Sequence, residues 1–414
     1  MFRFQRFPWA LCALLVLTAC ESHDRQAVSI ETTAATFAPH PDGPLAFDEA
    51  VRLLVARNPE LRATRARIQA VDITPGPGAV RATQQVLDGR ATELMVQTDL
   101  LALLGLGSRQ AEIAWARSVR SARVREHHER ARDLVADLAT AYATEQALAG
   151  LPSPTIDVDV SAFEKAGLAS DSLLSAAKAV ATEGEAEARV IAARLADQRR
   201  EIARLIGSTP TTTILPVGWD AATPAIDTPD RRTLLLARGD LQTLMARWHT
   251  ADRQFKFEVE RQYPTIVAGL GNNLALNAPM QLIGIQLPLD APSRAKAAQH
   301  ARTAAFHELE SGVLAAMHDA ESGLLDLQAA TARFDAARAR VEAADDLLKS
   351  ERAHLETNPD GLDRVVLVAG RRVDAARQLR EAAVAHARAY VAAARAAGWP
   401  SAELVAEASE EASR

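Results

Sequence analysis

Apolar residues recur along the chain at helical spacing in some stretches and at strand spacing in others. Residues 47–71 and 231–261 show the helical period, and each predicted helix leads into a proline, Pro75 or Pro264. The same order of further elements follows each proline. The pattern therefore predicts an internal repeat.

Two pairs of extended segments follow these prolines. Residues 80–87 and 91–101 flank Asp88-Gly89-Arg90, and Asp-Gly between alternating runs is a strong signal of a hairpin turn. Residues 265–276 and 280–289 flank a second turn and contain no charged residue. We expect two β-hairpins. The alternative is that each is a short β-ribbon packed on helices.

Each predicted hairpin leads into a long helix and a returning helix. Residues 103–149 and 293–355 contain no proline and would extend roughly 70 and 95 Å as helices. Residues 168–206 and 362–397 would return. The second long helix carries an apolar stripe at spacings of 3, 4 or 7 residues: Val313, Met317, Leu324, Leu327, Phe334, Val341 and Leu348. Such stripes predict antiparallel coiled coils.

The N-terminus has the features of an export and lipidation signal. Arg3 and Arg6 precede an apolar run at 7–17 that is too short for a stop-transfer helix. The run ends in Leu17-Thr18-Ala19-Cys20, which resembles a bacterial lipobox. We expect a signal peptide at 1–19, cleavage before Cys20 and lipidation of its thiol. The alternative is plain cleavage that leaves the cysteine free.

Composition favours helices and excludes some partners. Only 4% of the 414 residues are aromatic, which argues against a large globular core, and the abundance of strong helix formers favours long helices. The 47 basic and 53 acidic residues give a net charge of -6, so there is no basic field for nucleic acid. Two cysteines exclude a disulfide framework or a multi-cysteine metal cluster.

Catalytic and metal-binding motifs are weak. In Glu126-His127-His128-Glu129 the adjacent histidines of a helix point about 100° apart and cannot chelate together. His307-Glu308 lacks the second histidine of the zinc protease motif. Ser311-Gly312 lies in mid-helix and is not a nucleophile elbow. We expect no enzyme activity, no metal and no cofactor.

Short motifs stand at the joints between these elements. They are Asn58-Pro59-x-Leu61, Arg238-Gly239-Asp240-Leu241, Gly107-Ser108-Arg109, residues 290–294, Ala166-Gly167-Leu168-Ala169-Ser170 with Leu173-Leu174, and Leu362-Asp363. In their order, spacing and duplication, over about residues 45–399, the chain resembles the TolC-type outer-membrane factor family. Members of this family are exit ducts of tripartite efflux pumps and type I secretion systems.

The resemblance implies a mainly α fold with a small β part and an internal duplication. Long antiparallel coiled-coil helices would form a trimeric α-barrel, and two β-hairpins per protomer would contribute to a shared short β-barrel. The expected domains are a lipid-anchored tether at 20–44, repeats at 45–227 and 228–399, and an acidic tail at 400–414. The implied function is passive transport by an outer-membrane lipoprotein channel. The implied partners are two further copies, a periplasmic adaptor, an inner-membrane transporter and outer-membrane lipid.

The resemblance also suggests sites. Asp363 and Asp360 are candidate gate residues, with helix capping as the alternative. The candidate adaptor-contacting tips are Gly167, Leu168, Ala169, Ser170, Gly361 and Leu362. In a membrane barrel the polar strand positions must face the lumen, namely Arg81, Glu93, Gln97 and Asp99.

Two departures from the family favour a rival hypothesis. The first strand is about 8 residues long, whereas a membrane strand needs roughly 9 to 11. Pro152 and Pro154 stand where the family continues its helix, so the first coiled-coil hairpin should be shorter than usual. The rival is a lipid-anchored periplasmic helical scaffold of the same family, with a stunted barrel and no open duct.

Overall fold

The fold is described from a computed structural model. It covers residues 43–71, 80–87, 90–99, 108–156, 170–209, 214–219, 236–273, 278–286, 289–357, 361–400 and 404. The signal peptide, Cys20 and nearly all of the tether and the acidic tail lie outside these residues, so those assignments stay predictions. So do the domain boundaries.

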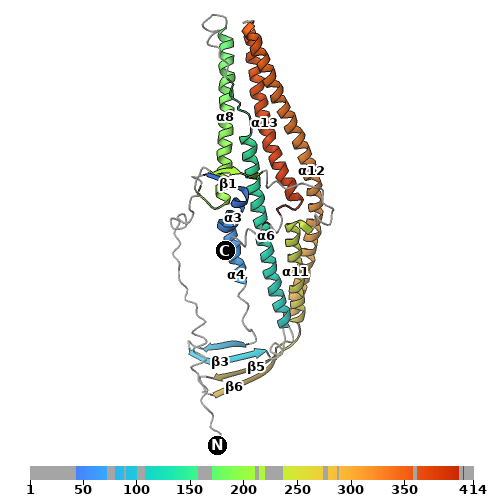
Figure 1. The fold of residues 1–414 in the computed structure, drawn as a ribbon. Helices are drawn as coiled ribbons and strands as arrows, with labels where there is room; N and C mark the ends of the chain where they lie inside the picture. Colours follow the sequence, from blue (N-terminus) through green and yellow to red (C-terminus); the bar gives the residue numbers. More distant parts are fainter. Residues whose placement is uncertain are drawn as a thin grey trace. The chain divides into compact units, whose positions relative to one another are not determined.

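Both halves of the chain contain the same order of elements (Figure 1). The first half contains α3 (Phe47–Arg57), α4 (Pro59–Val71), β2 (Val80–Leu87), β3 (Arg90–Asp99), α6 (Ser108–Ala149) and α8 (Asp171–Leu205). The second contains α11 (Gly239–Glu260), β5 (Thr265–Asn273), β6 (Ala278–Gln286), α12 (Ala291–Thr357) and α13 (Leu362–Ala396). The predicted sequence of helix, hairpin, long helix and returning helix is confirmed.

The first predicted helix is not continuous. It is broken at Asn58, whose ψ of 123° is not helical, because a proline disfavours the helical conformation in the residue before it. Pro59 then begins α4 at the position where its missing N–H costs nothing. In the second half the chain is likewise extended at Arg238 before α11 begins.

A small parallel sheet was not predicted. β1 (Gly43–Ala46) pairs with β4 (Ile214–Val217), in a register that sets Gly43 opposite Ile214. The end of the predicted tether, Gly43 and Pro44, therefore belongs to the folded body. Leu45 and Ile214 are both fully buried, which ties the start of this body to the connection after α8.

Four aromatic residues gather in one core around α3. Phe47 meets Tyr142 and Trp219 edge-on, at centroid distances of 5.3 and 5.1 Å, and stacks on Trp399 at 6.3 Å. The Tyr142 hydroxyl donates a hydrogen bond to the Leu45 carbonyl at 3.1 Å. This cluster holds together the elements where the short helices meet the long ones.

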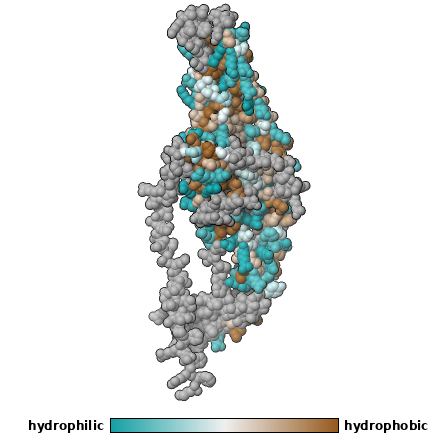
Figure 2. Space-filling model, viewed as in Figure 1, coloured by the Kyte–Doolittle hydropathy of each residue, from teal (hydrophilic) through white to brown (hydrophobic). Residues whose placement is uncertain are grey.

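Elsewhere the core is a seam between helices. α12 and α13 run side by side (Figure 1), and every residue of the predicted α12 stripe is buried or half-buried. Figure 2 shows hydrophobic residues interspersed with hydrophilic ones over the helical surface. A buried ion pair between Glu187 and Arg380 links α8 to α13.

α6 ends at Ala149, and α8 extends beyond it towards the helical tip (Figure 1). After Ala149, residues 150–156 run without helical structure. The Pro154 carbonyl lies where a Cβ on Gly184 of α8 would come within 2.8 Å of it, and Ile156 packs in a cluster with Val365 and Val368 of α13. α6 thus ends just before Pro152 and Pro154, while the prediction that the first coiled-coil hairpin is shorter than usual stays a prediction.

Candidate functional site

The two hairpins join into one open sheet. Its order is β2-β3-β5-β6, and all neighbours are antiparallel. β2 and β6 form the edges and pair with no further described strand. The two hairpins are therefore joined: β3 pairs with β5 over seven positions, from Glu93↔Asn273 to Asp99↔Val267.

The register gives the sheet two different faces. Arg81 lies opposite Gln97, and Gln97 opposite Gly269. Because positions of one face alternate along a strand, Glu93 and Asp99 share this face. All four predicted lumen positions thus fall on one side, together with glycines of β5 and β6 and with apolar positions such as Met95, Val267 and Leu282.

The opposite face carries many apolar positions, with Asn272 and Gln281 among them. It carries Leu94 and Val96 at the positions paired with Asn272 and Leu270, and the pairs Ile266↔Ile285 and Ala268↔Ile283. Ile283 is 83% exposed and Ile285 is 71% exposed. Exposed side chains of this kind on one face indicate contact with lipid or protein.

The helical tips are described only in part. Ser170 caps α8, and its Oγ accepts a hydrogen bond from the Leu173 N–H at 3.4 Å. Gly361 is the N-cap of α13 and Leu362 is buried. Asp363 lies exposed in the first turn of α13, where a carboxylate interacts favourably with the helix dipole. Gly167, Leu168, Ala169 and Asp360 lie outside the described residues, so the adaptor contacts and the gate stay predictions.

Each returning helix ends against the break of a short helix, through equivalent glycines. Gly207 follows α8 with φ +70°, and Gly398 follows α13 with φ +98°. A Cβ on Gly207 would come within 2.9 Å of the Arg57 carbonyl oxygen, and one on Gly398 within 2.7 Å of Ala237 Cβ. Arg57 and Ala237 immediately precede the two breaks. The two halves therefore share the same junction.

Different side chains bind the two junctions. In the first, Asn58 donates from Nδ2 to the Leu205 carbonyl at 2.8 Å and accepts from the Glu60 N–H at 2.9 Å. In the second, the buried Arg132 of α6 donates to three carbonyls: Pro400 at 2.7 Å, Ala237 at 2.8 Å and Gly398 at 2.7 Å. Gly239 stands where the family usually has proline, and a Cβ there would collide with the Arg132 and Glu129 side chains.

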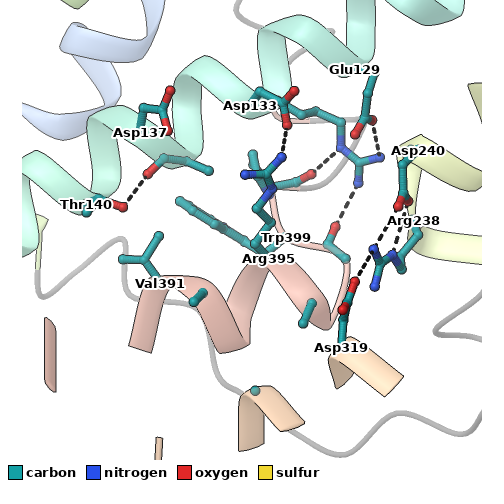
Figure 3. Close-up of a pocket in the computed structure, with 18 of the residues that line it drawn as sticks. Glu129, Asp133, Asp137, Thr140, Arg238, Asp240, Asp319, Val391, Arg395 and Trp399 are labelled. Atoms are coloured by element: carbon teal, nitrogen blue, oxygen red, sulfur yellow. Dashed lines mark hydrogen bonds and ion pairs between the residues drawn. The ribbon is translucent and has the colours of Figure 1, made fainter. Parts of the chain in front are cut away.

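An ion-pair network surrounds the second junction (Figure 3). Arg238 forms ion pairs with Asp240 at 2.7 Å and with Asp319 of α12 at 3.3 Å. Burial opposes ionisation of Asp240, but the hydrogen bond and charge of Arg238 outweigh it and lower the pKa of this carboxyl. Arg395 of α13 forms an ion pair with Asp133 of α6.

Two acids of this network are harder to ionise than usual. Burial, together with the charge of Asp133, raises the pKa of Glu129. Burial also raises the pKa of Asp133, although Arg395 opposes that shift. The ion pairs of this network join α6, α11, α12 and α13 to one another. These helices are rich in alanine and offer little apolar area for packing.

The comparisons with known proteins agree with this architecture. The outer membrane protein VceC from Vibrio cholerae is 20% identical and superposes with a TM-score of 0.63 over 85% of this chain and 96% of its own. The transmembrane channel CusC is 16% identical, with a TM-score of 0.68 over 85% and 92%. The outer membrane channel MtrE of Neisseria gonorrhoeae is 15% identical, with a TM-score of 0.65 over 85% and 88%. The fold of this chain is that of the TolC-type outer-membrane channels.

The likeness lies in structure rather than in sequence. No protein-family model and no curated protein matches the sequence. In the described part of the chain, no helix has the length and apolar character needed to cross a bilayer. The same residues contain no cluster of three or more His, Cys, Asp or Glu side chains that could hold a metal ion.

The side chains of the Glu126-His127-His128-Glu129 motif have different partners in the fold. The His127 ring Nδ1 lies 2.6 Å from Thr64 Oγ1 of α4. Glu126 instead forms ion pairs with Arg123 and Arg247. The motif therefore serves the packing of α6 against its neighbours. Sequence reasoning missed Arg132 as a junction residue, because an arginine in a long charged helix is typical of a solvated face.

Proposed function

We propose that this protein is a lipid-anchored outer-membrane channel and the exit duct of a tripartite efflux or type I secretion system. The observation that carries the proposal is the open four-stranded sheet, which brings the polar positions Arg81, Glu93, Gln97 and Asp99 to one face, in a chain with the TolC-type fold. An unpaired strand edge inside a membrane leaves backbone groups without hydrogen-bond partners. Three copies joined edge to edge would supply twelve strands and close the barrel.

The register supports a barrel with a polar lumen. The opposite face, which includes Ile283 and Ile285, would meet lipid, and Arg81, Glu93, Gln97 and Asp99 would line the interior. The strands have 8, 10, 9 and 9 residues, close to the lower limit of roughly 9 to 11 for a membrane strand. The barrel we propose is therefore short.

The remaining parts follow from the same assignment. Lipidated Cys20 would anchor the homotrimer to outer-membrane lipid. The tips at Gly167–Ser170 and Gly361–Leu362 would meet a periplasmic adaptor that connects the duct to an inner-membrane transporter. Transport through the duct is passive, because the energy enters at the transporter, and rings of Asp363 and Asp360 would guard the periplasmic opening.

Planar-bilayer recording of the purified trimer tests the proposal. We expect stepwise conductance. Asp99→Asn and Glu93→Gln should shift the reversal potential away from cation selectivity, because each removes three charges from the lumen of a trimer. Thr98→Val, at a position on the opposite face, is the control and should leave selectivity unchanged. Persistent silence from an intact trimer would rule out the channel.

One observation favours the rival hypothesis of a periplasmic helical scaffold. β2 has only 8 residues, and the chain leaves helical structure after Ala149, so both the membrane end and the first tip depart from the usual design. A lipidated trimer that shows no conductance in the bilayer would support the scaffold hypothesis. The two functions are thus separated by the same experiment.

A further inference from the structure

A groove of about 790 Å³ lies between α6 and α11. Two hydrogen bonds show how these helices pass each other. Arg125 Nη1 donates to Gln242 Oε1 at 3.1 Å, and Thr250 Oγ1 donates to the Ser118 carbonyl at 3.1 Å. As residue numbers fall along α6 they rise along α11, so the helices are antiparallel. Residues just before 118 therefore lie level with residues just beyond 250.

Apolar side chains in and just before α11 line one stretch of the groove, beside the hydrogen-bonded Arg125 and Gln242. Leu236 and Met245 line it and are 60% and 44% exposed. Leu241 and Ala246 complete this lining and are themselves buried. Large apolar side chains left in water cost free energy that a ligand chain would recover by covering them.

The other stretch is basic. Arg117 of α6 and Arg253 and His249 of α11 line it, and no Asp or Glu is among the described residues that do so. Arg117 and Arg253 make no ion pair or hydrogen bond with any described residue. This contrasts with the second junction, where the arginines are paired with carboxylates. Two unneutralised guanidinium groups at one end of an apolar strip attract an anion with an apolar tail.

We propose that this groove binds a medium-chain fatty acid, with its acyl chain along Met245 towards Leu241 and its carboxylate between Arg117 and Arg253. Met245 and Arg253 are two turns apart on α11, a distance of ~12 Å at the helical rise, which a medium-length chain spans. The volume is within the roughly 300–1,000 Å³ of small-molecule sites. Guanidinium groups bind carboxylates through charge-assisted hydrogen bonds. The proposal is independent of channel activity.

Photolabelling of the full-length protein in phosphatidylcholine nanodiscs tests the site. The probes are a diazirine analogue of dodecanoic acid and the matching analogue of dodecanol. We expect the acid to label peptides that contain residues 114–125 and 236–253, and the alcohol to label them about tenfold less, since the charge-assisted pairs are lost. Equal labelling by both probes would overturn the proposal, as would labelling confined to other peptides.

Matched variants separate the charge from the fold. Arg117→Gln with Arg253→Gln should reduce labelling by the acid about tenfold, and the double lysine variant should retain most of it. Arg364→Gln with Arg371→Gln removes two charges from exposed positions of α13 and should change nothing. Wild-type labelling of the double glutamine variant would sink the proposal. So would a cross-link showing that another copy of the chain fills the groove.

Discussion

Asn58 Nδ2 donates a hydrogen bond of 2.8 Å to the main-chain carbonyl of Leu205. The same side chain accepts through Oδ1 from the N–H groups of Glu60 and Leu61. One buried amide thus satisfies the last turn of α8 and the first turn of α4 together. This contact joins the end of α8 to the start of α4 beside the long α6.

Asn58→Ala should destabilise the protein by about 2 to 4 kcal/mol, because it removes a helix cap and leaves the Leu205 carbonyl buried without a donor. Thermal unfolding followed by circular dichroism measures the change. Gln299→Ala, at an exposed position of α12, is the control and should stay within about 0.5 kcal/mol of wild type. Equal effects of the two substitutions would contradict the junction role.

Arg132→Met should cost about 3 to 5 kcal/mol, because three carbonyls at the end of α13 and the start of α11 lose a common donor. Arg132→Lys should recover only part of this, since an ammonium lacks the forked geometry. Gly239→Ala should also destabilise the protein, because its Cβ displaces the Arg132 side chain. In the Arg132→Met background, Gly239→Ala should lower the free energy of unfolding by about 1 kcal/mol less than it does in the wild type. Strict additivity would disprove the coupling.

Gly207→Ala and Gly398→Ala should each destabilise by about 1 to 3 kcal/mol, since both glycines have positive φ and face close backbone or Cβ neighbours. Gly370→Ala is the matched substitution inside α13. A Cβ there meets only Val180 at an ordinary 3.5 Å, so it should stabilise by roughly 0.5 to 1 kcal/mol. In the unfolding experiment, we expect Gly207→Ala and Gly398→Ala to lower the free energy of unfolding and Gly370→Ala to raise it.

His127 should make stability fall as the pH drops. Burial, followed by the charges of His128 and Arg65, lowers the pKa of His127 from 6.5 to about 4. The folded state therefore favours the neutral ring. Its contribution is fully present above the unfolded pKa and is lost as the pH falls from 6.5 towards 4, by at most ~3 kcal/mol.

His127→Gln should flatten the pH dependence of the unfolding free energy in that window, while its amide can still donate to Thr64. The exposed His300→Gln should leave the dependence as in wild type. Denaturant titrations at a series of pH values between 4 and 7 make the comparison. An unchanged slope in His127→Gln would refute the assignment.

Local signals predicted most of the fold. The Asp88-Gly89 turn, the prolines and the apolar stripe of α12 each act within a few residues, so the hairpins and long helices could be assigned from the sequence. The common face of Arg81, Glu93, Gln97 and Asp99 followed from the strand period and one turn. Ser170, predicted as a tip contact, caps α8 in the structure.

Long-range relationships were out of reach. The pairing of β1 with β4 joins segments far apart in sequence, and neither segment carries a strand pattern long enough to read. Arg132 bonds to carbonyls near the C-terminus, and a backbone carbonyl has no signature in the sequence. The joining of the hairpins through β3 and β5 likewise depends on how the two halves meet in space.

The edges of β2 and β6, which pair with no other described strand, also bear on how the protein is made. A single copy inserted into a bilayer alone would carry two rows of backbone N–H and C=O groups that nothing satisfies. In the channel we propose, insertion and oligomerisation would then be one event, with a rate that rises steeply with protein concentration. A substitution that weakens edge pairing would appear first as degraded, unassembled chains rather than as a leaky pore.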